Sequence, residues 1–153
     1  METRIDYDRV ATGAAQAMLG MEGYVRGSAL EPALLELVKM RASQLNGCAY
    51  CLDMHSKDAR AAGETEQRLY VLPAWREAPF YTPRERAALA WTEALTLISA
   101  TDITDELYAA TRERFDEREL VDLTMAVITI NGWNRLAIAF RSPVGSYQPK
   151  ANV

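Results

Sequence analysis

Helix-start signals recur along this chain, and no segment shows the convincing polar–apolar alternation of a strand. The capping-box pattern, a small hydroxyl or acidic residue followed three positions later by glutamate, occurs at Thr82-x-x-Glu85 and Asp116-x-x-Glu119. Ser28-x-x-Glu31 shows the same pattern before Pro32, a residue that the first turn of a helix tolerates. We therefore expect helices to begin at these places and the fold to be all-α, a compact bundle of several helices.

Apolar spacing extends this prediction along the chain. We expect a first helix over about 8–26, a second from Pro32 to about Leu45, and a short helix from Thr104. The long helix after Asp116 is apolar nearly all round in its middle, at 125–130. Such a helix is buried on several sides, either in the centre of the domain or in a subunit interface.

Length and charge exclude several classes of protein. A chain of 153 residues forms one domain with a sizeable core, and its formal net charge of −4 gives neither a basic stripe for nucleic acid nor a polybasic membrane surface. We expect one domain over 1–142 and an extended C-terminal tail over 143–153, after Ser142-Pro143. The first residues have no apolar core for a signal peptide, so a cytoplasmic location without membrane association is expected.

The chemistry is concentrated in one motif, Cys48-Ala-Tyr-Cys51-Leu-Asp-Met-His55, which holds the only two cysteines and the only histidine of the chain. Asn46-Gly47 before it is a strong helix stop, so a new helix is expected to begin near Cys48. On that helix the two cysteines and His55 share one face. In a reducing cytosol, such a dithiol is catalytic or metal-binding rather than a structural disulfide.

A cysteine at a helix start is a potential nucleophile, because the helix dipole stabilises its thiolate. The helix dipole favours Cys48 as the reactive thiolate. The neighbouring base, His55, favours Cys51 in that role instead. A histidine that accepts a thiol proton needs a third group to orient it. The candidate is Glu36, which interrupts the apolar run Leu34-Leu35-Glu-Leu37-Val38.

Several other interpretations are open. Each cysteine and the histidine could be ordinary core residues, and Glu36 could pair with Lys39 at the surface. Two cysteines, His55 and Glu36 could complete a zinc site, although three ligands crowded on one helix face fit it poorly. A thioredoxin fold lacks its βαβ context here. Asn131 and Asn134, which flank Gly132, are interpreted as serving a local break or an interface, without a catalytic role.

Glu36 followed by C-x-x-C-x-x-x-H resembles the alkylhydroperoxidase D-like branch of the carboxymuconolactone decarboxylase family. The resemblance continues in Lys39-Met-Arg-Ala-Ser-Gln-Leu-Asn-Gly-Cys48, in the segment 75–91 and in Asn131-Gly-Trp-Asn-Arg-Leu-Ala137. It covers most of 30–140. The resemblance implies a homo-oligomer, usually a trimer or hexamer, with its pocket near a subunit boundary.

The resemblance also implies roles for the motif residues. Glu36 and His55 form a proton relay, Cys51 attacks a hydroperoxide, and Cys48 closes a disulfide with it. An external dithiol, of a lipoyl or thioredoxin-like kind, then reduces the pair, and neither cofactor nor metal is needed. The best-known peroxidases of the family carry a second histidine where this chain has Tyr50, so the relay here is shorter.

Two other functions remain open. Relatives in the family decarboxylate a lactone acid without a dithiol, and in that case His55 and Glu36 would be the acid–base groups. Alternatively, the dithiol would sense oxidation in a non-enzymatic protein, because sensors and peroxidases share low-pKa thiols.

Overall fold

The computed structural model describes residues 2–149 and confirms the predicted all-α fold, with no strand in that range. A 3-10 turn, η1 (Leu72–Ala74), follows the fifth helix. The helices are α1 (Tyr7–Val10), α2 (Thr12–Arg26), α3 (Pro32–Asn46), α4 (Ala49–Ala61), α5 (Glu66–Val71), α6 (Pro83–Thr96), α7 (Asp105–Arg112) and α8 (Glu117–Phe140).

Two of the three expected capping boxes are present. Thr82 caps α6 and Asp116 caps α8, in each case with the reciprocal bond from the glutamate three positions later. The capping box expected at Ser28 is wrong, although α3 does begin at Pro32. The hydroxyl of Ser28 instead donates to the carbonyl of Val25, at the end of α2, and Glu31 is the N-cap without a side-chain bond.

Other differences are local. The predicted first helix is interrupted at Ala11, where the backbone leaves helical geometry and separates α1 from α2. The sequence patterns did not predict α5, a short helix capped by the hydroxyl of Thr65. In the middle of α8, Val127 and Ile130 are buried but Ile128 is 47% exposed, so the burial expected there on several sides is incomplete.

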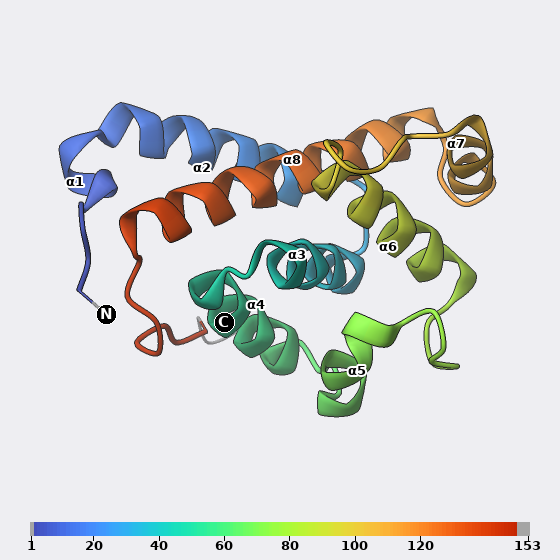
Figure 1. Cartoon of the computed structure of the whole chain (residues 1–153), viewed down its shortest axis with the longest axis horizontal. Helices are drawn as coiled ribbons and strands as arrows, with labels where there is room; N and C mark the ends of the chain where they lie inside the picture. Colours follow the sequence, from blue (N-terminus) through green and yellow to red (C-terminus); the bar gives the residue numbers. More distant parts are fainter. Residues whose placement is uncertain (1, 150–153) are drawn as a thin grey trace.

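Helix α3 lies at the centre of the molecule and packs against α4, α6 and α8 (Figure 1). The long α8 runs beside α2, and α4 lies beside α3 on the side of the C-terminal segment (Figure 1). The main apolar core lies where α2, α3, α6 and α8 meet, around Leu35, Val38 and Leu123. A smaller cluster joins the two cysteines to Ala42, Ile130 and Ala137. The cysteines are therefore held between three packed helices.

The segment after α8 forms no helix within residues 142–149 and returns to α4 (Figure 1). Gly145 N–H donates to Asp53 at 3.1 Å, and Lys57 donates to the carbonyl of Tyr147 at 3.0 Å. The last four residues of the predicted tail, 150–153, lie outside the described residues, and the domain boundary at 142 stays a prediction. None of the described helices combines the length and apolarity that crossing a bilayer requires.

Candidate functional site

The turn between α3 and α4 places both cysteines at a helix start. Gly47 has φ +67°, a left-handed conformation that glycine adopts without strain and that ends α3. Cys48 is the N-cap of α4, and Cys51 lies in its first turn. Both residues are 1% exposed. The helix end expected at Gly47 is therefore present. Cys51 and His55 lie one turn apart on α4, with Cys48 at its N-cap, so the expected shared face is present as well.

The two thiols form a close pair. Both are free, and their Sγ atoms lie 2.8 Å apart. The hydrogen bond between the two thiols lowers the pKa of Cys48 to about 7, helped by backbone N–H groups of α4 and the Asn134 amide against the cost of burial. That same bond to Cys48, together with burial, raises the pKa of Cys51. Cys48 is therefore the thiol of the reduced pair that loses its proton first.

A buried polar group from α8 supports this pair. Asn134 is fully buried and donates through Nδ2 to the hydroxyl of Ser43 at 3.0 Å. Its carbonyl oxygen accepts from Asn46 Nδ2 at 2.9 Å. Hydrogen bonding by Asn134 lowers the pKa of both cysteines, and Ser43 does so for Cys51. Asn134 therefore acts in the thiol environment, and not only at a local break or an interface as the sequence suggested.

The predicted partner of His55 is in place. Glu36 Oε2 lies 2.9 Å from His55 Nδ1, and His55 is 5% exposed. The other carboxylate oxygen of Glu36 lies 3.4 Å from Lys39 Nζ, so the histidine bond and the expected alternative ion pair are both present. Although burial raises the pKa of Glu36, the hydrogen bond and charge of His55 and the charge of Lys39 outweigh it and lower that pKa.

The histidine makes no hydrogen bond to the sulfurs. Over residues 2–149, no hydrogen bond joins His55 to either cysteine, and its link to Cys51 is their shared face of α4, one turn apart. Any transfer of a proton between thiol and imidazole therefore needs an intervening group or a small movement of a side chain.

A hollow of about 570 Å³ lies between the N-terminal end, α4 and the C-terminal segment, and neither cysteine lines it. Its walls include Tyr50 from α4, Tyr7 and Asp8 from the N-terminal end, and Ser142 and Tyr147 from the C-terminal segment. Tyr50 also packs against the cysteine cluster. Burial raises the pKa values of Tyr7 and Tyr50. Tyr50 is therefore the residue that connects this hollow to the cysteine cluster.

The possible metal ligands do not form the zinc set considered from the sequence. Of the described histidine, cysteine and acidic side chains, a single convergent group is present, made of Glu36, His55 and Asp58, with ligand atoms within 4.8 Å of one another. The cysteines lie outside this group. The cysteines and the carboxylate–histidine pair are therefore two adjacent clusters rather than one tetrahedral site.

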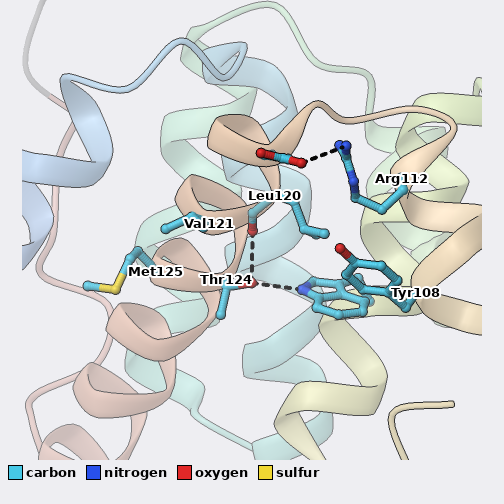
Figure 2. Close-up of a pocket in the computed structure, with 8 residues that line it drawn as sticks. Tyr108, Arg112, Leu120, Val121, Thr124 and Met125 are labelled. Carbon is cyan, nitrogen blue, oxygen red and sulfur yellow. Dashed lines mark hydrogen bonds and ion pairs between the residues drawn. The ribbon is translucent and has the colours of Figure 1, made fainter. Parts of the chain in front are cut away.

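A second hollow, of about 340 Å³, lies at the other end of α8. It is lined by Trp91, Tyr108, Leu120, Val121 and Met125, and the indole N–H of Trp91 bonds to Thr124 beside it (Figure 2). Its lining is mostly apolar, and it contains no thiol or histidine. It is not part of the candidate site.

Sequence reasoning missed several residues at the site. Ser43, Tyr7 and Tyr147 reach it from separate elements, and the chain carries no local pattern that predicts their convergence. Asp58 did have a signal, because it lies three residues after His55 on α4. Asn134 did have a signal, since it is polar within an apolar helix, but its interaction with the thiols depends on how α8 crosses α3.

The chain has clear relatives. Residues 12–94 match the model of the carboxymuconolactone decarboxylase family. The uncharacterized protein YdfG of Bacillus subtilis is 46% identical over 146 residues, which are 95% of this chain and 99% of YdfG. A crystal structure from Agrobacterium tumefaciens, of a protein of unknown function named as a candidate antioxidant-defence protein AhpD, is 42% identical with a TM-score of 0.91 and covers 95% of this chain and 100% of its own.

A more distant solved structure has the same fold. An uncharacterized peroxidase-related protein from Silicibacter is 24% identical with a TM-score of 0.78, over 88% of this chain and 72% of its own. At that identity, the likeness shows a shared fold only.

Proposed function

Because this chain belongs to the alkylhydroperoxidase D-like branch of the carboxymuconolactone decarboxylase family, we propose that it reduces organic hydroperoxides through Cys48 and Cys51. The observation that carries the proposal is the buried thiol pair, with Sγ atoms 2.8 Å apart and the pKa of Cys48 lowered to about 7. A structural thiol in an apolar core has a raised pKa and needs no such stabilisation. The hollow that Tyr50 lines offers room for a substrate, which would need a small side-chain movement to reach the buried thiols.

The reaction uses the two thiols as a two-electron donor. The thiolate of Cys51 attacks the terminal oxygen of the hydroperoxide, the O–O bond breaks, and the alkoxide leaves and takes a proton. Cys51 is then a sulfenic acid. The thiolate of Cys48 attacks that sulfur, an S–S bond forms, and water leaves. An external dithiol of the lipoyl or thioredoxin-like class returns both electrons by thiol–disulfide exchange.

The choice of Cys51 as the attacking thiol rests on the family resemblance and on the neighbouring base, since Cys51 lies one turn before His55 on α4. The pKa directions of the pair favour the anion on Cys48. Transfer of a proton across the 2.8 Å between the sulfurs moves the anion to Cys51. Attack by Cys51 leaves Cys48, at the helix start, as the resolving thiolate.

Glu36 and His55 are proposed as the proton relay. Glu36 fixes the imidazole through Nδ1, which leaves Nε2 free to exchange a proton with the thiol side of α4. This arrangement is the orienting carboxylate and base expected for an activated nucleophile. The dithiol peroxidase is preferred over an acid–base decarboxylase, because a decarboxylase would not need the paired thiols.

We also propose that the chain forms a homo-oligomer, a trimer or hexamer. Apolar side chains are exposed on α8 and α7, including Val121 (55%), Ile128 (47%) and Tyr108 (48%), beside the apolar hollow of Figure 2. Burial of this face between copies would remove it from water. A monomer mass by light scattering at micromolar concentration would contradict this assembly.

The function is tested by one equivalent of an uncharged organic hydroperoxide, such as cumene hydroperoxide, added to the reduced protein. Thiol titration is expected to lose both thiols, and mass spectrometry to find an intrachain Cys48–Cys51 link. Addition of a dithiol is expected to restore both thiols with turnover. Survival of the thiols would sink the proposal, and a disulfide that forms without turnover would indicate a sensor instead.

A further inference from the structure

Asn134 presents its side chain to the cysteines from α8. Ile130 and Ala137 on the same helix belong to the buried cluster that contains both cysteines. Asn134 lies four residues after Ile130 and three before Ala137, so the three share one face of α8. A side-chain amide has two ends of opposite character, because its nitrogen donates two hydrogen bonds and its oxygen only accepts them. The end that faces the sulfurs therefore decides whether this amide stabilises or repels a thiolate.

The donor end of Asn134 lies on the thiol side. Its Nδ2 donates to the hydroxyl of Ser43 at 3.0 Å. Because the Ser43 oxygen accepts this bond, its own hydrogen is left to donate elsewhere. Although the bond to Cys48 and burial raise the pKa of Cys51, hydrogen bonding by Asn134 and Ser43 acts to lower it. A reversed amide would take up the Ser43 hydrogen and turn its own lone pairs to the sulfurs, so both donors depend on one orientation.

Asn46 selects this orientation of the amide. The hydroxyl of Ser43 is compatible with either end of Asn134, since a hydroxyl can donate or accept. On the opposite side, Asn46 Nδ2 donates to Asn134 Oδ1 at 2.9 Å, and its second hydrogen goes to Asn131 Oδ1 at 3.0 Å. Reversal of the Asn134 amide would bring two NH2 groups together and lose a hydrogen bond of a fully buried side chain.

We propose that Asn46 is a positioning residue, which holds the Asn134 amide with its donor end toward the two thiols. Asn46 ends α3 and lies two residues before Cys48, so it couples the turn that carries the thiols to α8. A backbone bond from Cys48 N–H to the carbonyl of Ser43, at 3.0 Å, fixes the same turn. The consequence for peroxide reduction rests on the proposed function, whereas the orientation of the amide does not.

The titratable groups around the thiols stay the same when Asn46 is replaced. His55 lies on the face of α4 that carries the thiols and pairs with Glu36 of α3. Tyr50 packs against the cysteine cluster, and Tyr7 lines the same hollow as Tyr50. Burial raises the pKa values of both phenols, so neither carries a charge at pH 7. A change in thiol reactivity on replacement of Asn46 therefore reports on the amides.

The test is a double-mutant cycle on the reduced full chain, read by the rate of thiol alkylation as a function of pH. Its members are wild type, Asn46→Ala, Asn134→Ala and the double variant. Asn46→Asp keeps the shape of the side chain but cannot donate, so the Asn134 amide is expected to reverse toward the carboxylate. Gln44→Ala is the matched control, because it removes a neighbouring amide of α3 that bonds to Arg41 instead. Circular dichroism identifies any variant that fails to fold, and Asn46→Asp then replaces Asn46→Ala in the cycle.

At pH 7, alkylation is expected to slow about threefold in Asn46→Ala, as for loss of part of one hydrogen bond to a thiolate, and further in Asn46→Asp. The midpoint of the pH profile should rise in both variants and stay unchanged in Gln44→Ala. In the Asn134→Ala background, Asn46→Ala should have no further effect, because the amide through which it acts is absent.

An unchanged profile in Asn46→Ala, or an equal slowing in both backgrounds, overturns the inference. The cycle uses no hydroperoxide, so its outcome is separate from that of the peroxidase assay. Coupling between Asn46 and Asn134 in a protein that does not reduce hydroperoxides supports the inference and overturns the proposed function.

Discussion

Asn134 donates a hydrogen bond to Ser43 at 3.0 Å and thereby joins the second half of α8 to the helix that precedes the cysteines. Both residues are fully buried. The same amide stabilises negative charge on the thiols. Packing of α8 on α3 and the reactivity of the dithiol therefore depend on one side chain.

Replacement of Asn134 by alanine is expected to change both properties. The pKa of Cys48 should rise above about 7, because the thiolate loses a hydrogen-bond donor. The free energy of unfolding should fall by about 2 kcal/mol, since Ser43 and Asn46 lose their buried partner. The rate of thiol alkylation as a function of pH measures the change in pKa. Urea unfolding measures the change in stability. Asn131→Ala is the control and is expected to leave the pH profile of alkylation unchanged. If both variants give the same profile, Asn134 does not influence the thiols.

The roles of the two cysteines give opposite outcomes in single variants. Cys51→Ser is expected to abolish peroxide consumption even in one turnover, because the proposed attacking thiol, one turn before His55, is lost. Cys48→Ser should still consume one equivalent and leave a sulfenic acid on Cys51, which a dimedone-type probe traps. Mass spectrometry locates the adduct. A trapped sulfenic acid on Cys48 in the Cys51→Ser variant would reverse the assignment.

The relay is tested through the pH at which the thiols react. In wild type, alkylation is expected to reach its half-maximal rate near pH 7, following the pKa of Cys48. His55→Gln and Glu36→Gln should move this midpoint upwards, because the imidazolium that holds a thiolate is lost or loosened, with His55→Gln the larger effect. Unchanged midpoints in both variants would leave the helix start and the Asn134 amide as the activators.

The sequence predicted those parts of the fold that depend on local chemistry. Thr82 and Asp116 mark helix starts because a capping box is made within four residues, and Gly47 marks a helix end because it takes a positive φ. Ser28 shows the same pattern but bonds elsewhere, because the preceding turn offers it the carbonyl of Val25. Local patterns thus identify helices more reliably than they identify individual bonds.

The candidate site was predictable where its residues share one helix or a recognisable spacing. Cys48, Cys51 and His55 follow helical periodicity, and Glu36 was marked by its place in an apolar run. Tyr147 reaches Asp58 across a sequence separation of 89 residues, which no local pattern records. The close approach of the two sulfurs was not predictable either, because the arguments from the helix start and from the base do not include the hydrogen bond between the thiols, which lowers the pKa of Cys48 and raises that of Cys51.

A partly buried ion cluster away from the site predicts the acid sensitivity of the fold. Glu93 on α6 accepts from Trp75 Nε1 at 2.8 Å and from Arg41 Nε at 2.7 Å, and it pairs with Arg76 at 2.6 Å. Burial raises the pKa of Glu93, but these bonds and the charge of Arg41 outweigh it and lower that pKa. The stabilisation is therefore fully present above the pKa of the unfolded chain, about 4.3. It is lost as the pH falls through the lower pKa of the folded state.

Glu93→Gln is accordingly expected to lower the free energy of unfolding by about 2 kcal/mol at neutral pH, because Arg41 and Trp75 keep only part of their partner. The difference from wild type should shrink at pH values near 3, where the glutamate of the wild type also begins to take up a proton. Urea unfolding at both pH values measures this. Glu66→Gln, whose carboxylate is 59% exposed and lies 3.7 Å from Arg60, is the control and should change stability by less than about 0.5 kcal/mol. A Glu93→Gln deficit that stays constant with pH would show that shape and packing, rather than charge, account for the loss.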